Sequence, residues 1–340
     1  RSLRHISQRV AAFQTLVGPN GSGKSTFLDV VGFLGDMLRV GPLRAILGEG
    51  TSVQQRAADP RHLCWMREGV SFELAVELAI PVERLARLEN KRLAAARYEV
   101  EVQVGAGGSD EVRLGNETLW LLPLNDELPP SAPWELFPRS RQTPDSIVAQ
   151  SGKRTPSGWR KVVNKNAGSG IDYFLSETSG WNNPFRLGPG RSALANLPED
   201  EERFPVATWV KRVLMEGVTR VVLNAEAMRR PSAPGSPRRF LPDGSNLPWV
   251  VHELKERRPE KFELWVDHFR TAIPDLKSVS TVEREEDRHR YIVVEYENGL
   301  RAPSWVVSDG TLRMLALTLL AFIDDVEGVY LIEEPENGVH

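Results

Sequence analysis

The chain has 340 residues, and its 43 Lys and Arg against 46 Asp and Glu give a formal net charge of −3. This charge excludes a globally basic nucleic-acid-binding protein, and a single cysteine excludes a disulfide framework or a cysteine-rich zinc site. The longest apolar run, residues 315–323, is too short to cross a membrane, and no signal peptide is recognisable. We therefore expect a soluble protein, cytoplasmic in location, with no membrane partner.

The first predicted elements are a strand and a helix on either side of a glycine-rich turn. Residues 12–17 form a short apolar run before a glycine-rich turn, which predicts a buried strand. Apolar residues then recur at helical spacing from Phe27 to Leu38, which predicts a helix that Gly41 and Pro42 end.

The middle of the chain favours β-structure. Alternating apolar residues predict strands over residues 72–80 and 98–104 and one or two more over 112–122, forming an antiparallel segment. Residues 123–200 are rich in Pro, Gly, Ser and Asn, with irregular strands expected near 158–163 and 171–175.

Helical spacing returns in the last part of the chain. It predicts helices over residues 205–216, 247–257 and 259–273, with Ser245 and Asn246 as an N-cap for the second. A strand over residues 291–296, an apolar helix over 310–323 and a short buried strand over 328–332 follow.

One motif indicates a phosphate site. Residues 18–25 read GPNGSGKS, match G-x-x-x-x-G-K-[ST], and lie between a predicted strand and a predicted helix. Glycines let backbone N–H groups face a phosphate, and the helix adds its positive end. Lys24 would reach the β- and γ-phosphates and Ser25 would ligate Mg²⁺. The residues expected to bind the nucleotide in this loop are Gly18, Asn20, Gly21, Ser22, Gly23, Lys24, Ser25 and Thr26.

A second feature lies at the other end of the chain. The apolar strand over residues 328–332 ends in Glu333 and Glu334, and ligands bind at this edge of an open α/β sheet. Glu333 would hold Mg²⁺ through its water shell, and Glu334 would act as the general base for the attacking water. The alternative is a solvated acidic strand end.

A third feature opens the predicted helix near residue 310. Ser308, Asp309 and Gly310 at a helix N-terminus would form a second anion site, which could clamp a nucleotide held by another copy of the chain. The plainer interpretation is an ordinary N-cap, and this segment taken alone favours it.

Together, GPNGSGKST, SDGTLR and LIEEPENGVH resemble the ABC/SMC-like ATPases, including RecF-like and OLD-like heads. The resemblance implies an α/β P-loop NTPase head with a mixed β-sheet lobe and an inserted β-rich and helical middle segment. It also implies a homodimer around ATP, with Mg²⁺ as the metal. Ser308, Asp309 and Gly310 would then contact the γ-phosphate across the dimer. Asn337 and Gly338 match the loop between the two sites.

The chain also departs from that class. SDG replaces the LSGGQ of transporters, and Glu333 stands where an Asp is more usual. Gln54 and Gln55 are candidates, by distance only, for the glutamine that senses Mg²⁺. His340 is not the switch histidine of the class. We expect the chain to be cut short before the switch histidine is reached, and to lack its natural start.

The resemblance divides the chain into four segments. Residues 1–60 are expected to form the N-terminal part of the head, 61–200 an inserted arm, 201–300 a segment leading to the signature, and 301–340 the C-terminal part of the same head. The two halves of the ATP site are therefore expected to fold together.

The expected function is that of an ATPase in DNA repair or anti-phage defence. DNA and a nuclease or toxin effector are candidate partners. The alternatives are the nucleotide-binding subunit of a transporter and a P-loop small-molecule kinase. The distance from Lys24 to Ser308 disfavours the first, and the SDGT helix with its paired glutamates disfavours the second. The six histidines show no metal-ligand spacing. The tryptophans favour core packing over base stacking, and the Arg pairs favour a solvated surface over contacts with a nucleic-acid backbone.

Overall fold

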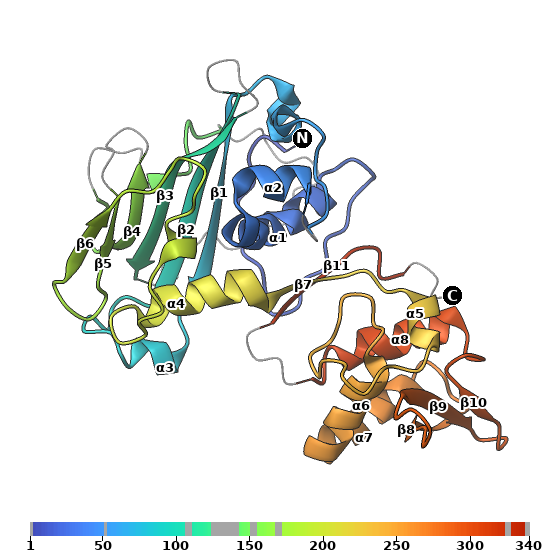
Figure 1. The fold of residues 1–340 in the computed structure, drawn as a ribbon. Helices are drawn as coiled ribbons and strands as arrows, with labels where there is room; N and C mark the ends of the chain where they lie inside the picture. Colours follow the sequence, from blue (N-terminus) through green and yellow to red (C-terminus); the bar gives the residue numbers. More distant parts are fainter. Residues whose placement is uncertain are drawn as a thin grey trace. The chain divides into compact units, whose positions relative to one another are not determined.

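A computed structural model describes residues 3–50, 53–105, 111–123, 143–149, 155–166, 172–323 and 328–336. The chain forms two compact units, Arg1–Gly217 and Val218–His340, each with a hydrophobic core of its own (Figure 1). No described helix is long and apolar enough to cross a membrane. The expected folding of the two chain ends into one head stays a prediction.

The first unit is built on an antiparallel sheet of six strands in the order β1-β2-β3-β4-β5-β6. The strands are β1 (Ser71–Ala79), β2 (Ala95–Val104), β3 (Val112–Leu122), β4 (Arg160–Asn166), β5 (Asp172–Leu175) and β6 (Asn182–Phe185). The strands predicted between residues 72 and 175 are confirmed, and residues 112–122 form one strand rather than two. Strand β6 was not predicted because its sequence, NNPF, carries almost no apolar alternation.

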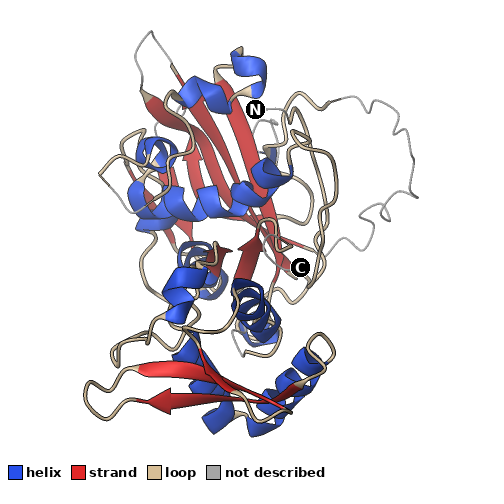
Figure 2. Ribbon diagram, turned by 90° about the vertical axis from the view of Figure 1, so that its right-hand side faces the viewer, coloured by secondary structure: helices blue, strands red, loops and turns tan. Residues whose placement is uncertain are grey.

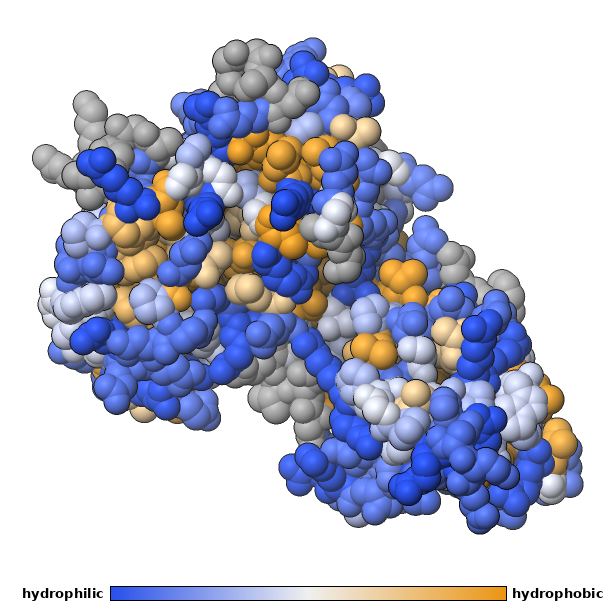
Figure 3. Space-filling model, in the orientation of Figure 1, coloured by the Kyte–Doolittle hydropathy of each residue, from blue (hydrophilic) through white to orange (hydrophobic). Residues whose placement is uncertain are grey.

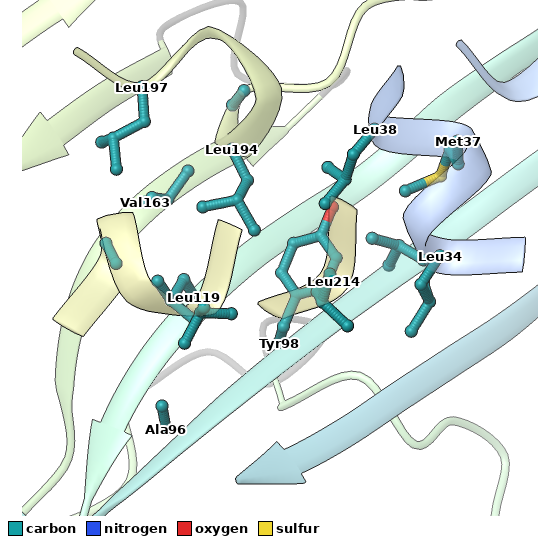
Figure 4. Close-up of a cluster of buried hydrophobic side chains, with 14 of the residues drawn as sticks. Leu34, Met37, Leu38, Ala96, Tyr98, Leu119, Val163, Leu194, Leu197 and Leu214 are labelled. Atoms are coloured by element: carbon teal, nitrogen blue, oxygen red, sulfur yellow. The ribbon is translucent and has the colours of Figure 1, made fainter. Parts of the chain in front are cut away.

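Helices cover one face of this sheet (Figure 2). The main ones are α1 (Lys24–Val40), α2 (Pro42–Leu47) and α4 (Pro205–Arg212), and the predicted end of α1 at Gly41 is confirmed. Leu34 and Met37 of α1 pack beside Tyr98 of the sheet in the buried cluster (Figure 4). The shorter turns are η1 (Pro60–Leu63), η2 (Trp65–Arg67), α3 (Val82–Leu85), η4 (Leu194–Asn196) and the π-helical η5 (Val213–Gly217).

One glycine sets how closely α1 packs. A Cβ on Gly35 would lie 2.2 Å from the carbonyl oxygen of Leu214 in η5, so only glycine allows this approach. Residues 205–216 were predicted as one helix. They form an α-helix followed by a π-turn, and the backbone of this turn contacts α1. The C-terminal half of α1 therefore packs closely against η5.

The buried strand expected over residues 12–17 is not present. This segment has no regular structure, and Phe13 and Val17 are 88% and 91% exposed within their unit. A strand is stable only when its backbone pairs with a neighbour, and no hydrogen-bonded neighbour is found for it among the described residues. Figure 3 shows apolar surface on one face of the first unit.

The second unit begins and ends with paired strands. Strands β7 (Val218–Val221) and β11 (Val329–Ile332) form a parallel pair. Between them lie α5 (Ala225–Arg229), α6 (Leu247–Arg257), α7 (Pro259–Arg270), β8 (Leu276–Glu283), β9 (Arg290–Tyr296), β10 (Arg301–Pro303) and α8 (Asp309–Leu319). Strands β8 to β10 form an antiparallel sheet in the order β10-β9-β8. The predicted helices and β9 are confirmed, while β7, β8, β10 and α5 were not predicted.

The expected N-cap of α6 is only partly correct. Asn246 occupies the N-cap position, but its side chain makes no capping bond. The buried amide donates instead to the carbonyl oxygens of Pro237 and Arg239, at 2.7 and 2.6 Å, and accepts from the N–H of Leu241 at 2.9 Å. The irregular loop before α6 has no regular backbone pairing and needs these bonds. Because Pro248 in the first turn has no N–H, α6 also has one donor fewer that requires a cap.

A buried carboxylate caps helix α4 in the first unit. The two oxygens of Glu177 accept the N–H groups of Val206 and Ala207, each at 2.7 Å. Burial raises the pKa of Glu177 to about 7, although the two N–H bonds and the charges of Arg160 and Arg84 act in the opposite direction. The start of α4 therefore rests on a group that titrates near neutral pH.

We predict that Glu177 makes the stability of the first unit fall as the pH rises from 5 to 8. Its folded pKa exceeds the ordinary value of 4.5, so its contribution is complete below pH 4.5 and is lost as the pH passes 7. At 1.36 kcal/mol per pKa unit the change is at most about 3 kcal/mol. Urea unfolding of the wild type and of Glu177→Gln measures it, because glutamine does not titrate. A difference between the two proteins that stays constant with pH contradicts the prediction.

Candidate nucleotide site

The phosphate-loop motif forms a curled loop that ends at the first residue of α1. Gly21 and Gly23 have φ values of 78° and 97°, in the left-handed region that favours glycine. The N–H of Ser22 donates to the carbonyl of Pro19 at 3.2 Å, and that of Phe27 donates to Gly23 at 2.8 Å. Gly23 is the N-cap of α1, so the loop delivers the chain directly into the helix.

The N-terminus of α1 is open to an anion. No side chain caps it, and its first turn holds no acidic residue. The first N–H groups of a helix lack intrahelical partners and carry a partial positive charge. The Nζ of Lys24 lies over the loop, where it donates to the carbonyls of Gly18 and Pro19 at 2.6 and 3.0 Å.

The other residues expected in the loop remain accessible. Asn20, Ser22 and Ser25 are exposed, whereas Thr26 is half-buried. The hydroxyl of Ser25 stands in the first turn of α1, one residue after Lys24. This one loop therefore contains side-chain and backbone donors for a phosphate together with a hydroxyl oxygen for a hard cation.

The segment of Gln54 and Gln55 is tied to α1 by the next residue. The side chain of Arg56 is 7% exposed and contacts Asp29 at 2.9 Å and Asp36 at 2.8 Å, both on α1. The backbone N–H of Arg56 also donates to the carbonyl of Ile46 at 2.9 Å. Gln54 and Gln55 are exposed, and the role expected for them stays a prediction. Arg56 was not singled out from the sequence because charged residues are rarely buried without a partner, and its partners lie far away in the chain.

The acidic end of β11 lies in the second unit. Glu333 forms an ion pair at 2.9 Å with Arg220 of β7, the neighbouring parallel strand. Arg220 pairs in register with Leu331, so Arg220 and Glu333 lie on the same face, two residues apart along the strand. Glu334 is exposed and has a φ of 47°, an unusual conformation for a residue other than glycine. Arg220 was missed because four residues of β7 give too short a pattern to predict a strand.

Ser308 is an N-cap in the structure. Its Oγ accepts the N–H of Thr311 at 3.1 Å and donates to the Thr311 hydroxyl at 2.8 Å. Asp309 pairs with Arg229 at 2.5 Å, and Arg229 also donates to the carbonyl of Val307 at 3.1 Å. The plainer interpretation of this segment therefore accounts for its local geometry. A contact with a second phosphate, through Ser308 or the half-buried Gly310, stays a prediction.

The predicted site residues thus occur in two groups. The loop from Gly18 to Thr26 belongs to the first unit, whereas Ser308, Glu333 and Glu334 belong to the second. Asn337, Gly338 and His340 lie outside the described residues. In the part of the chain that the structure describes, no three His, Cys, Asp or Glu side chains gather as metal ligands.

A comparison with protein families identifies the chain. The model described as "AAA domain, putative AbiEii toxin, Type IV TA system" matches residues 15–340, so the chain belongs to this family. The match begins just before the phosphate loop and includes the acidic strand. No curated protein and no solved structure matches the chain.

We predict that Gly23→Ala disrupts the phosphate loop. Alanine is strained at a φ of 97°, and its Cβ would lie 2.6 Å from Cδ2 of Leu3. The expected result is a Kd for ATP raised at least about tenfold, which corresponds to about 1.4 kcal/mol. Gly188→Ala is the matched control, because a Cβ there meets no heavy atom within 4 Å. Isothermal titration measures both variants, and equal affinities would refute the assigned loop geometry.

Proposed function

We propose that this AAA-domain protein binds ATP with Mg²⁺ and hydrolyses it to ADP and phosphate. The observation that carries the proposal is the uncapped N-terminus of α1, with Lys24 lying over a loop of left-handed glycines. Such a loop supplies convergent N–H donors, a helix dipole and an ammonium group to a triphosphate. Membership of the AAA family supports nucleotide binding.

Hydrolysis needs groups that the phosphate loop alone does not supply. In the proposal, Ser25 and Glu333 serve Mg²⁺, the first through its hydroxyl oxygen and the second through metal-bound water. Both are oxygen donors, as a hard cation requires. The ion held there would supply neutralisation of the charge that develops on the phosphates. Glu334 orients and deprotonates the attacking water, for which an exposed carboxylate at a strand end is suitable.

We propose further that the protein works as an ABC/SMC-like dimer in which ATP lies between two copies. The sequences SDGTLR and LIEEPENGVH support this arrangement, with Ser308, Asp309 and Gly310 of one copy facing the γ-phosphate held by the other. Ser308 would have to exchange part of its hydrogen bonding with Thr311 for a phosphate oxygen. A transporter subunit or a small-molecule kinase remains the alternative.

The family description supports a biological setting in toxin–antitoxin or phage-defence systems. In that setting, ATP-driven association of heads would control a nuclease or toxin effector, with DNA as a candidate ligand. A role in DNA repair is the alternative within the same mechanism. The ATPase rate with and without DNA tests the link, because a rate unchanged by any nucleic acid argues against DNA as the ligand.

The hydrolytic assignment predicts different losses for its two central residues. Lys24→Ala is expected to lower both ATP binding and hydrolysis at least about tenfold, because the ammonium contacts the phosphates in the ground state. Glu334→Gln is expected to keep ATP affinity and to lower kcat about 10² to 10⁴-fold, as loss of a general base does. Binding by filter assay and phosphate release measure the two effects, with Lys277→Ala as a control on an exposed lysine.

The same variants test the dimer. Glu334→Gln with ATP and Mg²⁺ is expected to accumulate as a dimer in sedimentation velocity, whereas Lys24→Ala stays monomeric. A Glu334→Gln protein that binds ATP and remains monomeric contradicts ATP-dependent dimerisation. Hydrolysis left intact by Lys24→Ala contradicts the site itself.

A further inference from the structure

Two consecutive residues near the start of the chain connect the phosphate loop to an exposed tryptophan. Leu3 packs against Gly23, since a Cβ on that glycine would lie 2.6 Å from Leu3 Cδ2. The guanidinium of the next residue, Arg4, lies 5.1 Å from the ring centroid of Trp65. Because neighbouring Cα atoms are only about 3.8 Å apart, Trp65 lies within the reach of one arginine side chain from the residue that contacts Gly23.

Trp65 is held by the turn from which it projects. The residue before it, Cys64, is fully buried, and its N–H donates to the carbonyl of Arg61 at 3.1 Å. The two residues after it, Met66 and Arg67, have φ values of 53° and 64°. Such values are costly outside glycine and persist only where surrounding contacts impose them. The turn is therefore a defined structure that presents Trp65 at 42% exposure, with Met66 beside it at 61%.

These features match the requirements for binding an aromatic base. A large exposed ring fixed by its backbone loses little conformational freedom when a base stacks on it, and Arg4 can add a cation–π contact. A nucleotide whose phosphates occupy the loop must place its base a ribose away from them, in the region around Gly23. The apolar side chain of Leu3 lies against Gly23.

We propose that Trp65, with Arg4, is the base-binding platform of the nucleotide site. This rests on the proposed ATP binding at the phosphate loop. The base stacks on the indole ring, and the phosphates remain with Lys24 and the N-terminus of α1. Stacking reads the π-face and not the hydrogen-bonding edge of a base, so the platform favours purines over pyrimidines and discriminates weakly between ATP and GTP.

Comparison of ATP with inorganic triphosphate tests this proposal. Triphosphate uses the phosphate loop alone, whereas ATP uses the loop and the platform. Trp65→Ala is expected to raise the Kd for ATP about 5 to 150-fold, the range that corresponds to loss of one base–aromatic stack, and to change the Kd for triphosphate less than about twofold. Trp65→Phe restores most of the ATP affinity because a phenyl ring still stacks.

Trp305→Ala is the matched control, because Trp305 is similarly exposed, at 48%, but belongs to the second unit. It should leave both affinities unchanged. A second readout is intrinsic fluorescence: ATP quenches the wild-type signal by stacking on Trp65, while triphosphate leaves it unchanged, and the quenching is absent in Trp65→Phe. This readout does not depend on the alanine variant being well folded.

The outcomes separate the platform from the phosphate site. Equal loss of both ligands in Trp65→Ala, or no loss of ATP affinity, overturns the platform and leaves the phosphate loop intact. If a single-stranded oligonucleotide needs Trp65 for binding and ATP does not, the platform is likewise overturned. Trp65 would then bind a base of a nucleic acid instead. A wild-type protein that binds neither ATP nor triphosphate overturns the proposed ATP binding, and the platform with it.

Discussion

The left-handed backbone at Gly23 is the constraint on which the nucleotide site depends. It turns the loop into α1 without a capping side chain, so the positive end of the helix stays available to an anion. The helix in turn is fixed by its buried face against the sheet, by Gly35 against η5 and by Arg56 against Asp29 and Asp36. The loop lies at the surface, at the start of a helix that packs into the core, which suits pre-organised phosphate binding.

The acidic strand depends on a different interaction. Arg220 holds Glu333 on one face of the parallel β7–β11 pair, while Glu334 enters an unusual backbone conformation at the strand end. An ion pair of this kind keeps a carboxylate in one orientation. Tyr330 and Ile332, on the other face of β11 from Glu333, pack against the unit's core, so a packed strand presents the two carboxylates.

Local patterns carried most of the prediction. Helix α1, strands β1 to β3 and helix α8 follow from apolar spacing over seven or more residues, and the phosphate loop follows from its glycines. What the sequence did not reveal depends on distant partners: β7 needs β11, and Arg56 needs α1. Residues 12–17 looked like a strand because their apolar run is real, but a pattern cannot supply the neighbour that a strand must pair with. The combination of an exposed ring, a cation–π contact with Arg4 and the contact of Leu3 with Gly23 distinguishes Trp65, and no local pattern in the sequence shows it.

In the proposed function, one nucleotide engages both the phosphate loop and the acidic strand. Hydrogen–deuterium exchange with and without ATP and Mg²⁺ tests it most directly, because amides in a closed site exchange more slowly. We expect protection in residues 18–26 and also in Val329–Ile332 and the two glutamates after it, with neither change in Lys24→Ala. Protection confined to residues 18–26, with exchange at the acidic strand unchanged, would contradict it.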